Sequence, residues 1–455
     1  MINKPWYSPA TLAWLQNLLE ERFGHHFDLL PQSDGSSLAI GLPGDANRIT
    51  LTLDGATFTR ADSDLPCAQW DASAEGWHTA LRGYLPVPGA ASLPTPLVTA
   101  TECGWHVGYD ILGLSYWMLT RQEEVGRTDL DSHGRFPATA SHAYKNGYLE
   151  RPVVDEWLAI LGQVMQRAWP SLVLKKHAFT MKVSHDVDRP MRYGFKPFGS
   201  LLRAMVGDVV KHRDFKNALA APWLRIATKH QLHPADPFNT FDWLMDISES
   251  KNIKSAFYFI CGRTAPDKDA DYEPEHPAIR ALMCRIHQRG HEIGLHPSFN
   301  TYQNPKQLKH EFDRLKKICS EEKITQAEFG GRMHYLRWEH PTTLQAWNDA
   351  GLAYDSTLSY ADRPGFRCGT CFEYPGFNPC SQEQLKLRIR PLIAMECSVM
   401  GAGYMGLGDG DLAASKFLEL RDVCKQLNGC FTLLWHNSEL DRLSKRNIYA
   451  GLFCL

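Results

Sequence analysis

Two aspartates separated by one residue are the side chains in this sequence whose types and spacing best suit catalysis. Asp186 and Asp188 follow an apolar alternation that predicts a strand and that comprises Phe179, Met181 and Val183. Alternate residues of a strand project from the same face, so the two carboxylates emerge side by side. Two such groups ionise together only if a cation or a strong donor lies between them. The pair is a candidate for one metal ligand plus one general base; the alternative is a strand end that caps the next turn.

Four further polar side chains follow stretches that also predict strands. They are His296, Arg332, Asp355 and His436. Repeated strand and helix units imply a parallel sheet, and the active sites of barrel enzymes lie at the carboxyl ends of such strands. A neutral imidazole at such an end suits zinc. Each of these residues could instead have a purely structural role, such as a surface ion pair for Arg332. Their common position at strand ends nevertheless favours a single functional site.

Seven predicted strands must position these residues. They cover residues 179–185, 255–261, 291–295, 327–331, 353–356, 392–397 and 430–435. Helices alternate with them, because Asn304 and Pro305 form a typical helix start and Asp411 begins another helix. We therefore expect an α/β fold in which residues 176–455 form a (β/α) barrel.

A helical insertion is predicted to interrupt the barrel at about residues 190–240. Its two helical pieces, around 201–210 and 223–229, carry basic residues. These are Arg203, Lys211, Arg213, Lys216, Arg225 and Lys229. One interpretation is a solvated basic face, and the other is a lid over an acidic or phosphorylated substrate.

Residues 1–175 are predicted to form a separate N-terminal α+β domain. Leucines near positions 12–19 indicate an amphipathic first helix, and the stretch 37–59 alternates like a hairpin. Two more helices are expected at 111–124 and 153–169. This half carries no evident catalytic constellation, so we expect an accessory role for it.

Composition excludes several broad classes of protein. The chain of 455 residues is 44% hydrophobic and 22% charged, with a formal net charge of -2, which gives no general attraction to nucleic acid. The N-terminus lacks the apolar core of a signal peptide, and no apolar run reaches the length of a membrane span. We therefore expect a cytoplasmic protein without a transmembrane segment. Its oligomeric state is left open.

The twelve cysteines show no paired framework. Cys368, Cys371 and Cys380 raise the alternatives of zinc or redox chemistry, but no second cysteine pair accompanies them. Structural thiols are the favoured interpretation.

The order of five motifs resembles that of polysaccharide deacetylases of the NodB-homology type, carbohydrate esterase family 4. The motifs are Ser-His-Asp-Val-Asp at 184–188, Gly-His-Glu-Ile-Gly-Leu-His at 290–296, the strand end bearing Arg332, Tyr-Asp-Ser-Thr at 354–357 and Leu-Trp-His-Asn at 434–437. The resemblance is closest to a large bacterial subgroup with an extra N-terminal region. Short motifs of that subgroup resemble the sequence at residues 110–113, 118–124, 134–137 and 151–155. It implies a distorted (β/α)7-type barrel.

The resemblance also implies catalytic roles, residue by residue. Asp186 corresponds to the general base, and Arg332 to the residue that holds this base ionised. His436 corresponds to the general acid that protonates the leaving amine, and Asp355 to the residue that orients this histidine.

A divalent metal, with zinc preferred, is the cofactor that the resemblance implies. Asp188 and His296 correspond to two of its ligands. The third position is Asn300, where the family normally has a histidine, and an amide oxygen is a poorer zinc ligand than imidazole. His334 is the alternative third ligand.

The activity implied by the resemblance is metal-dependent hydrolysis of an N-acetyl or related acyl group from an amino sugar or polysaccharide precursor. Two other classes remain open, because fold and ligands do not determine the acyl group. One is a catalytically impaired barrel that binds carbohydrate or acts as a scaffold. The other is a metal hydrolase of a different non-peptide C–N bond, such as that of a cyclic amide.

Overall fold

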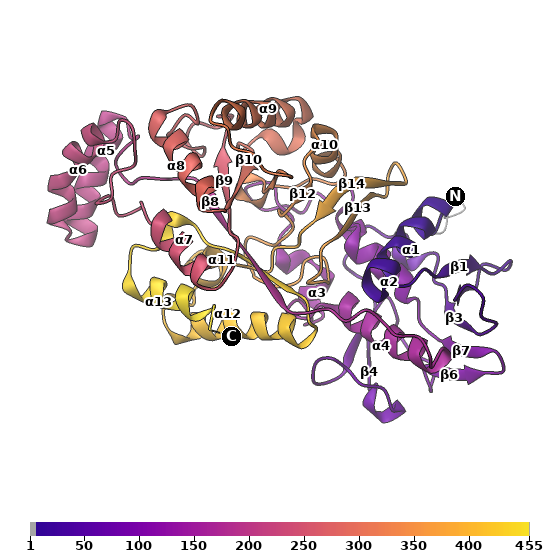
Figure 1. Cartoon of the computed structure of the whole chain (residues 1–455). Helices are drawn as coiled ribbons and strands as arrows, with labels where there is room; N and C mark the ends of the chain where they lie inside the picture. Colours follow the sequence, from indigo (N-terminus) through magenta and orange to yellow (C-terminus); the bar gives the residue numbers. More distant parts are fainter. Residues whose placement is uncertain (1–5, 455) are drawn as a thin grey trace.

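The computed structural model describes residues 6–454 as a mixed α/β protein with one large sheet (Figure 1). This sheet has nine strands in the order β13-β14-β12-β11-β10-β9-β8-β16-β15. Every neighbouring pair is parallel except β13 and β14. Parallel strands are buried on both faces, which agrees with their continuous apolar stretches.

All seven predicted strands of this sheet are present. They are β8 (Thr180–Val187), β9 (Ala256–Ile260), β10 (Glu292–His296), β11 (Gly330–Gly331), β12 (Tyr354–Asp355), β15 (Ala394–Met395) and β16 (Cys430–Leu434). The hairpin of β13 (Tyr374–Asn378) and β14 (Glu383–Ile389) was not predicted. Proline and glycine weaken the strand signal of β13, although β14 buries Leu385, Leu387 and Ile389 in alternation.

The hydrogen-bonded ladder of the large sheet is open, with β13 and β15 at its edges. Only residues 390–393 separate β14, which pairs with β12, from β15, which pairs with β16. This segment therefore connects the two ends of the parallel ladder. A closed barrel remains a prediction.

Helices pack around the large sheet, and two of them begin where the sequence predicted. Asn304 caps α9 by accepting from the Gln307 backbone N–H at 3.1 Å, and α12 begins at Asp411. The helices of this part are α7 (Phe241–Ser250), α8 (Pro277–Gln288), α9 (Pro305–Glu321), α10 (Thr342–Ala350), α11 (Glu396–Met400), α12 (Asp411–Gln426) and α13 (Leu443–Gly451).

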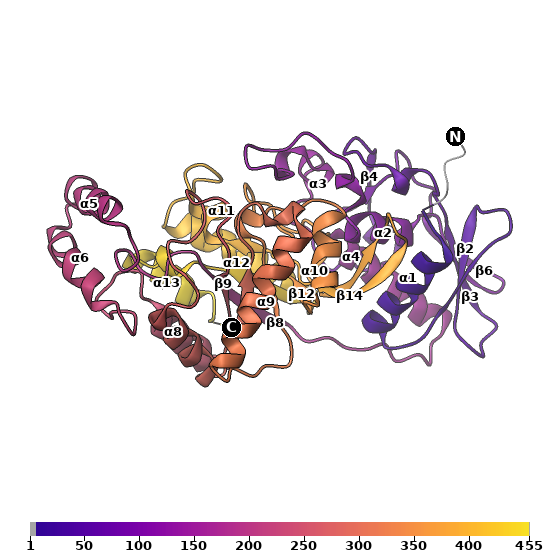
Figure 2. The same ribbon diagram turned by 90° about the horizontal axis from the view of Figure 1, so that it is seen from above.

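The predicted insertion forms a helical hairpin that projects from one end of the molecule (Figures 1 and 2). It consists of α5 (Phe198–Gly207), a π-helical turn (Asp208–His212) and α6 (Phe215–Ala227). The side chains of Lys211 and His212 lie outside the described part of the structure. Within residues 6–454, every helix is too short or too polar to span a bilayer.

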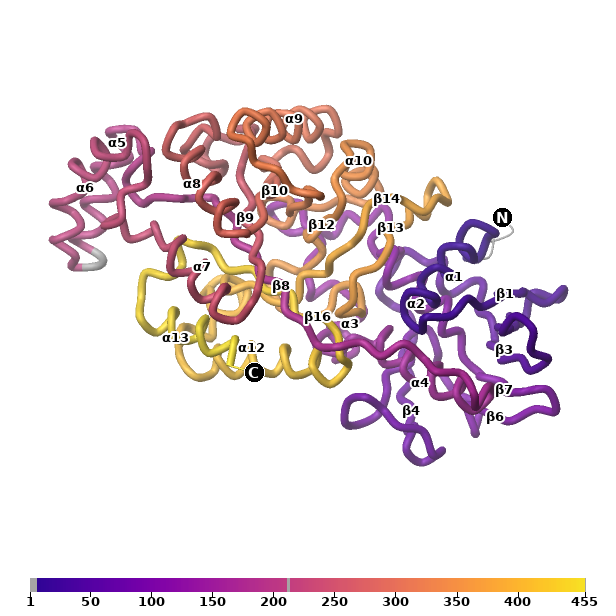
Figure 3. The backbone as a smooth tube through the Cα atoms, viewed as in Figure 1, coloured from indigo at the N-terminus to yellow at the C-terminus, as the bar shows by residue number. Residues whose placement is uncertain are grey.

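The N-terminal region lies at the opposite end of the molecule and contains its own five-stranded sheet, in the order β1-β2-β3-β7-β6, with β4 and β5 as a separate pair. Its first helix and its β2–β3 hairpin were predicted, and α2 ends earlier than expected. The elements are α1 (Pro9–Phe23), β1 (Asp28–Pro31), β2 (Ser37–Gly41), β3 (Arg48–Thr52), β4 (Cys67–Trp70), β5 (Leu85–Pro88), β6 (Val98–Thr101), β7 (Gly104–Val107), α2 (Ile111–Leu119), α3 (His142–Lys145) and α4 (Val153–Ala168). After α4 the chain runs directly into β8 (Figure 3).

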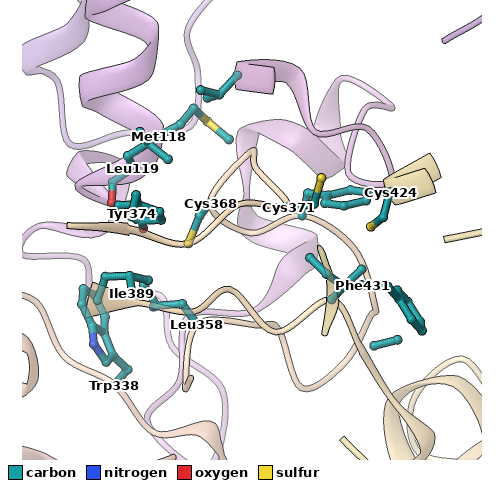
Figure 4. Packing of buried hydrophobic residues seen from close by; sticks show 14 of the residues in the cluster. Met118, Leu119, Trp338, Leu358, Cys368, Cys371, Tyr374, Ile389, Cys424 and Phe431 are labelled. Carbon is teal, nitrogen blue, oxygen red and sulfur yellow. The ribbon is translucent and has the colours of Figure 1, made fainter. Parts of the chain in front are cut away.

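One continuous hydrophobic core joins the N-terminal region to the large sheet (Figure 4). The Tyr374 hydroxyl donates to the Leu119 carbonyl of α2 at 2.8 Å, and the Trp14 indole donates to the Pro375 carbonyl at 2.8 Å. Cys368 and Cys371 are buried in this core. A separate N-terminal domain at 1–175 remains a prediction, but its residues pack closely on the rest of the chain.

A buried ion-pair cluster reinforces this contact. Glu124 accepts from Arg121 and from Arg367, with Nε to Oε1 distances of 2.9 Å for both arginines. All three side chains are buried. Burial raises the pKa of Glu124, but the two guanidinium groups outweigh it and lower this pKa to about 2. The contribution of these ion pairs to stability is present at neutral pH and is lost progressively as the pH falls from 4.5 toward about 2.

We expect Glu124→Gln to lower the free energy of unfolding by about 3 kcal/mol or more, because it removes the counter-charge of the buried Arg367 and leaves Arg121 with Glu123 alone. Urea unfolding followed by circular dichroism measures this change. Asp64→Asn, which breaks the exposed ion pair with Lys145, serves as the control and should leave the transition nearly unchanged. Equal stability of Glu124→Gln and the wild type would contradict the prediction.

Candidate active site

The strand ends of the large sheet converge on a cleft with a volume of about 730 Å³. Asp186, Asp188, His296 and His436 line this cleft, and they come from the carboxyl ends of β8, β10 and β16. Arg332, just after β11, is fully buried and reaches Asp186. The structure thus brings together five of the seven side chains that the sequence analysis singled out.

Asp186 and Arg332 form a buried ion pair. Arg332 Nη1 donates to Asp186 Oδ1 at 2.8 Å, and both side chains are at most 3% exposed. The remaining donors of the guanidinium bond Ser184 Oγ at 2.9 Å and both the carbonyl and the hydroxyl of Ser356. Opposite charges with satisfied hydrogen bonds compensate each other in a buried site. The second oxygen of Asp186 remains available on the cleft side.

Asp188, His296 and His334 form a group whose ligand atoms lie within 4.8 Å of one another. His296 Nε2 is 3.2 Å from Asp188 Oδ1, and His334 Nε2 is 3.6 Å from Asp188 Oδ2. His296 Nε2 and Asp188 Oδ1 are buried and have no hydrogen-bond partner among the described residues. Buried polar atoms rarely lack a partner, and two nitrogens with one carboxylate suit zinc. The donor set therefore fits a divalent cation.

Hydrogen bonds behind the two histidines leave their Nε2 atoms free for a ligand. His296 Nδ1 donates to the Arg332 carbonyl at 2.6 Å, and His334 Nδ1 contacts Asp269 Oδ1 at 3.1 Å. Such outer contacts set the tautomer and the ring orientation of metal-binding histidines. Both imidazoles are thereby preorganised toward Asp188.

The charged side chains of this group shift each other's pKa. Burial lowers the pKa of His334, but the carboxylates of Asp188 and Asp269 outweigh it and raise this pKa to about 9. Burial raises the pKa of Asp188, but the two histidines outweigh it and hold this pKa well below its usual range. A cation must therefore displace a proton from His334, so its affinity should rise with pH.

Asn300 lies outside this group. Its side chain is exposed, its Nδ2 donates to the Thr264 carbonyl at 3.1 Å, and its Oδ1 accepts from Arg337 at 3.0 Å. Both ends of the amide are thus engaged by residues away from Asp188. His334 lies where the third ligand was expected. Strand β11 pairs with β10 in the sheet, so the residues that follow β11 lie beside His296.

Asp355 is not the residue that contacts His436. It accepts from the Thr357 backbone N–H at 2.8 Å and from the Thr357 hydroxyl, which shapes the turn that presents Ser356 to Arg332. Burial raises the pKa of Asp355 to about 6. We conclude that Asp355 supports the arginine rather than the histidine.

Glu396 holds His436 instead. Its Oε1 lies 2.5 Å from His436 Nδ1, and its carboxylate is buried. Burial lowers the pKa of His436, but the Glu396 carboxylate outweighs it and raises this pKa well above its usual range. The contact with Glu396 therefore favours the protonated form of this imidazole.

Sequence reasoning named His334 only as an alternative and missed Glu396 and Asp269. Glu396 directly follows β15, inside the strand predicted at 392–397, so the strand-end rule that found the other residues would have found it. Asp269 lies in the loop after β9, and no local pattern distinguishes it.

Comparisons with known proteins match parts of the chain. A family model described as a family of unknown function (DUF7033) matches residues 43–170. No curated protein sequence matches the chain.

Three solved structures resemble about three fifths of the chain at low identity. A protein from Mycobacterium smegmatis, described as a polysaccharide deacetylase, is 14% identical with a TM-score of 0.37, over 61% of this chain and 83% of that one. The Puue allantoinase is 10% identical with a TM-score of 0.35, over 60% and 82%. A protein from Pseudomonas aeruginosa PAO1, also described as a polysaccharide deacetylase, is 12% identical with a TM-score of 0.34, over 61% and 83%. Function is therefore inferred from the geometry of the site.

We expect His334→Ala to reduce zinc affinity by about 100-fold or more, because it removes one of three ligands. Asn300→His should leave this affinity unchanged, since position 300 points away from the group. Isothermal titration calorimetry on metal-free protein measures both constants. If Asn300→His bound zinc more tightly and His334→Ala bound it as tightly as the wild type, Asn300 and not His334 would be the third ligand.

Proposed function

We propose that this protein is a metal-dependent hydrolase that removes an N-acetyl or related N-acyl group from an amino sugar or a polysaccharide precursor. The observation that carries this proposal is the placement of an arginine-paired carboxylate, a candidate cation group and a carboxylate-held histidine around one cleft. Each of the three arrangements supplies one requirement of amide hydrolysis: a proton acceptor, a Lewis acid and a proton donor.

The cation, with zinc preferred, would be held by Asp188, His296 and His334 in this proposal. Two imidazoles and one carboxylate are a common zinc ligand set that leaves a coordination position open. When bound, such a cation makes a coordinated water more acidic and polarises the acyl carbonyl.

Asp186 is the proposed general base. Its Oδ1 is occupied by Arg332, whereas its Oδ2 lies 3.6 Å from His296 Nε2 and therefore faces the cation group. The ion pair with Arg332 holds one oxygen, and the other oxygen is the one proposed to accept a proton from the attacking water.

His436 is the proposed general acid, and Glu396 is its positioning residue. Glu396 fixes Nδ1, so the proton of Nε2 remains available for the leaving amine. Nε2 lies 3.6 Å from Asp188 Oδ2, which places the donor next to the cation group. A protonated imidazole is the required form, because amines leave readily only after protonation.

The N-terminal region at 1–175 is proposed as an accessory domain that completes the cleft. Arg135 lines the cleft, and its Nη1 donates to the Tyr335 carbonyl at 2.9 Å. The insertion contributes Ser200 and Arg203 from the other side. The substrate cleft is thus bordered by three parts of the chain.

Asp186→Asn and His436→Ala should each lower turnover by about 100-fold or more. Release of acetate from nucleotide-, lipid- and oligosaccharide-linked N-acetylated amino sugars is the assay. Metal content and thermal stability, measured on the same samples, should remain close to those of the wild type for His436→Ala. A substrate that wild type and Asp186→Asn hydrolyse equally fast would refute the assignment of the base.

Glu396→Gln should move the basic limb of the pH–rate profile to lower pH. The acid acts only when protonated, and loss of the neighbouring negative charge lowers the pKa of His436, so activity declines at a lower pH. The profile of kcat against pH measures this shift, which a merely structural role for Glu396 would not produce. An unshifted basic limb with reduced kcat would mean that Glu396 acts on packing alone.

A further inference from the structure

The helical hairpin α5–α6 exposes an unusual concentration of large apolar side chains. Among the described residues, sixteen large hydrophobic side chains are exposed, and eight of them lie between positions 198 and 226. They are Phe198, Leu202, Val206, Val210, Phe215, Leu219, Trp223 and Ile226, with exposed fractions from 46% to 82%. Proteins that remain free in water rarely expose apolar surface on this scale, so a binding surface is indicated.

Helical spacing gathers these residues on one face of each helix. Positions 198, 202 and 206 recur every four residues on α5, and 215, 219, 223 and 226 form a similar stripe on α6. The opposite faces supply the hairpin's own core, in which Leu201, Ala221 and Leu224 pack with Tyr193. Each helix is therefore apolar on two sides, and the outer side is left uncovered.

The exposed charges of the hairpin are basic. Arg203, Arg213, Lys216, Arg225 and Lys229 are exposed. In contrast, Asp208 is buried against Arg192 and accepts from the Tyr193 hydroxyl at 2.7 Å. Asp214 caps α6 through the Asn217 backbone N–H at 3.1 Å. The hairpin thus presents positive charge, although the whole chain has a net charge of -2.

We propose that the α5–α6 hairpin docks on an anionic lipid bilayer. Apolar stripes flanked by lysine and arginine are the chemistry that inserts into the interface of a bilayer and attracts acidic headgroups. A second copy of the chain fits less well, because a symmetric contact would bring like charges together. The hairpin is also the part of the molecule farthest from the N-terminal region, so it can reach a flat surface unobstructed (Figure 2).

Docking of the hairpin brings the cleft beside the bilayer. Pro197 and Ser200 at the start of α5 line the cleft, as does Arg203 one turn later. The same helix therefore contributes one face to the proposed membrane contact and its first turns to the candidate active site. This relation follows from the geometry of the hairpin and does not depend on the reaction.

Sedimentation with vesicles tests the proposal on the full-length protein. Wild type should bind vesicles of phosphatidylcholine and phosphatidylglycerol, bind those of phosphatidylcholine alone more weakly, and release as salt is raised. Leu202→Ser combined with Leu219→Ser should weaken binding by about 10-fold or more. The matched control is Leu412→Ser combined with Leu443→Ser, which changes two leucines that are 70% and 73% exposed on α12 and α13, and it should bind as wild type does.

Brominated lipids provide a second readout, because Trp223 is 58% exposed on the proposed contact face. Its fluorescence should be quenched on binding, and Trp223→Phe should remove this quenching. Arg213→Gln combined with Lys216→Gln should weaken binding to acidic vesicles without altering the circular dichroism spectrum. Failure of wild type to bind acidic vesicles would overturn the proposal. So would a dimer in analytical ultracentrifugation that Leu202→Ser with Leu219→Ser abolishes, since the apolar face would then be a self-association surface.

Discussion

The buried guanidinium of Arg332 is the interaction on which the candidate site depends. Its donors reach Asp186 and Ser184 of β8 and Ser356 after β12, while its own carbonyl accepts from His296 of β10. One residue after β11 thereby ties four strand ends together. A buried positive charge is tolerated only with a counter-charge and satisfied donors. This requirement holds Asp186 beside the guanidinium, and the backbone carbonyl of the same residue holds His296.

The titratable residues of the site have different charged partners, so residues that are neighbours in the sequence lie in different electrostatic environments. Asp186 forms an ion pair with Arg332, whereas Asp188 lies 3.2 to 3.6 Å from His296, His334 and His436. Under the proposed function, this difference separates the proton acceptor from the metal ligand. Two of these histidines each contact a further carboxylate, because Asp269 contacts His334 and Glu396 contacts His436. These different partners create the chemical asymmetry on which the proposed hydrolysis depends.

The α5–α6 hairpin borders the cleft that contains these charged side chains. The hairpin interrupts the chain between β8 and β9, the first two strands of the large sheet along the sequence. An insertion at this point does not disturb the sheet, because the chain departs from the sheet and returns to it at the edge where the strands end. The same edge carries the site, so an added surface element lies close to it without altering the strand register.

The sequence by itself determined seven of the nine strands of the large sheet and several residues at their ends, because side chains in strands alternate with a period of two and helix caps are local. This was sufficient to place Asp186, Asp188 and His296 at one edge. Only the tertiary structure decided that His334 rather than Asn300 joins the ligands, and that Glu396 rather than Asp355 holds His436. Those contacts join residues 37 to 146 positions apart. They depend on which strands are neighbours in the sheet and on how their loops turn, which no local pattern encodes.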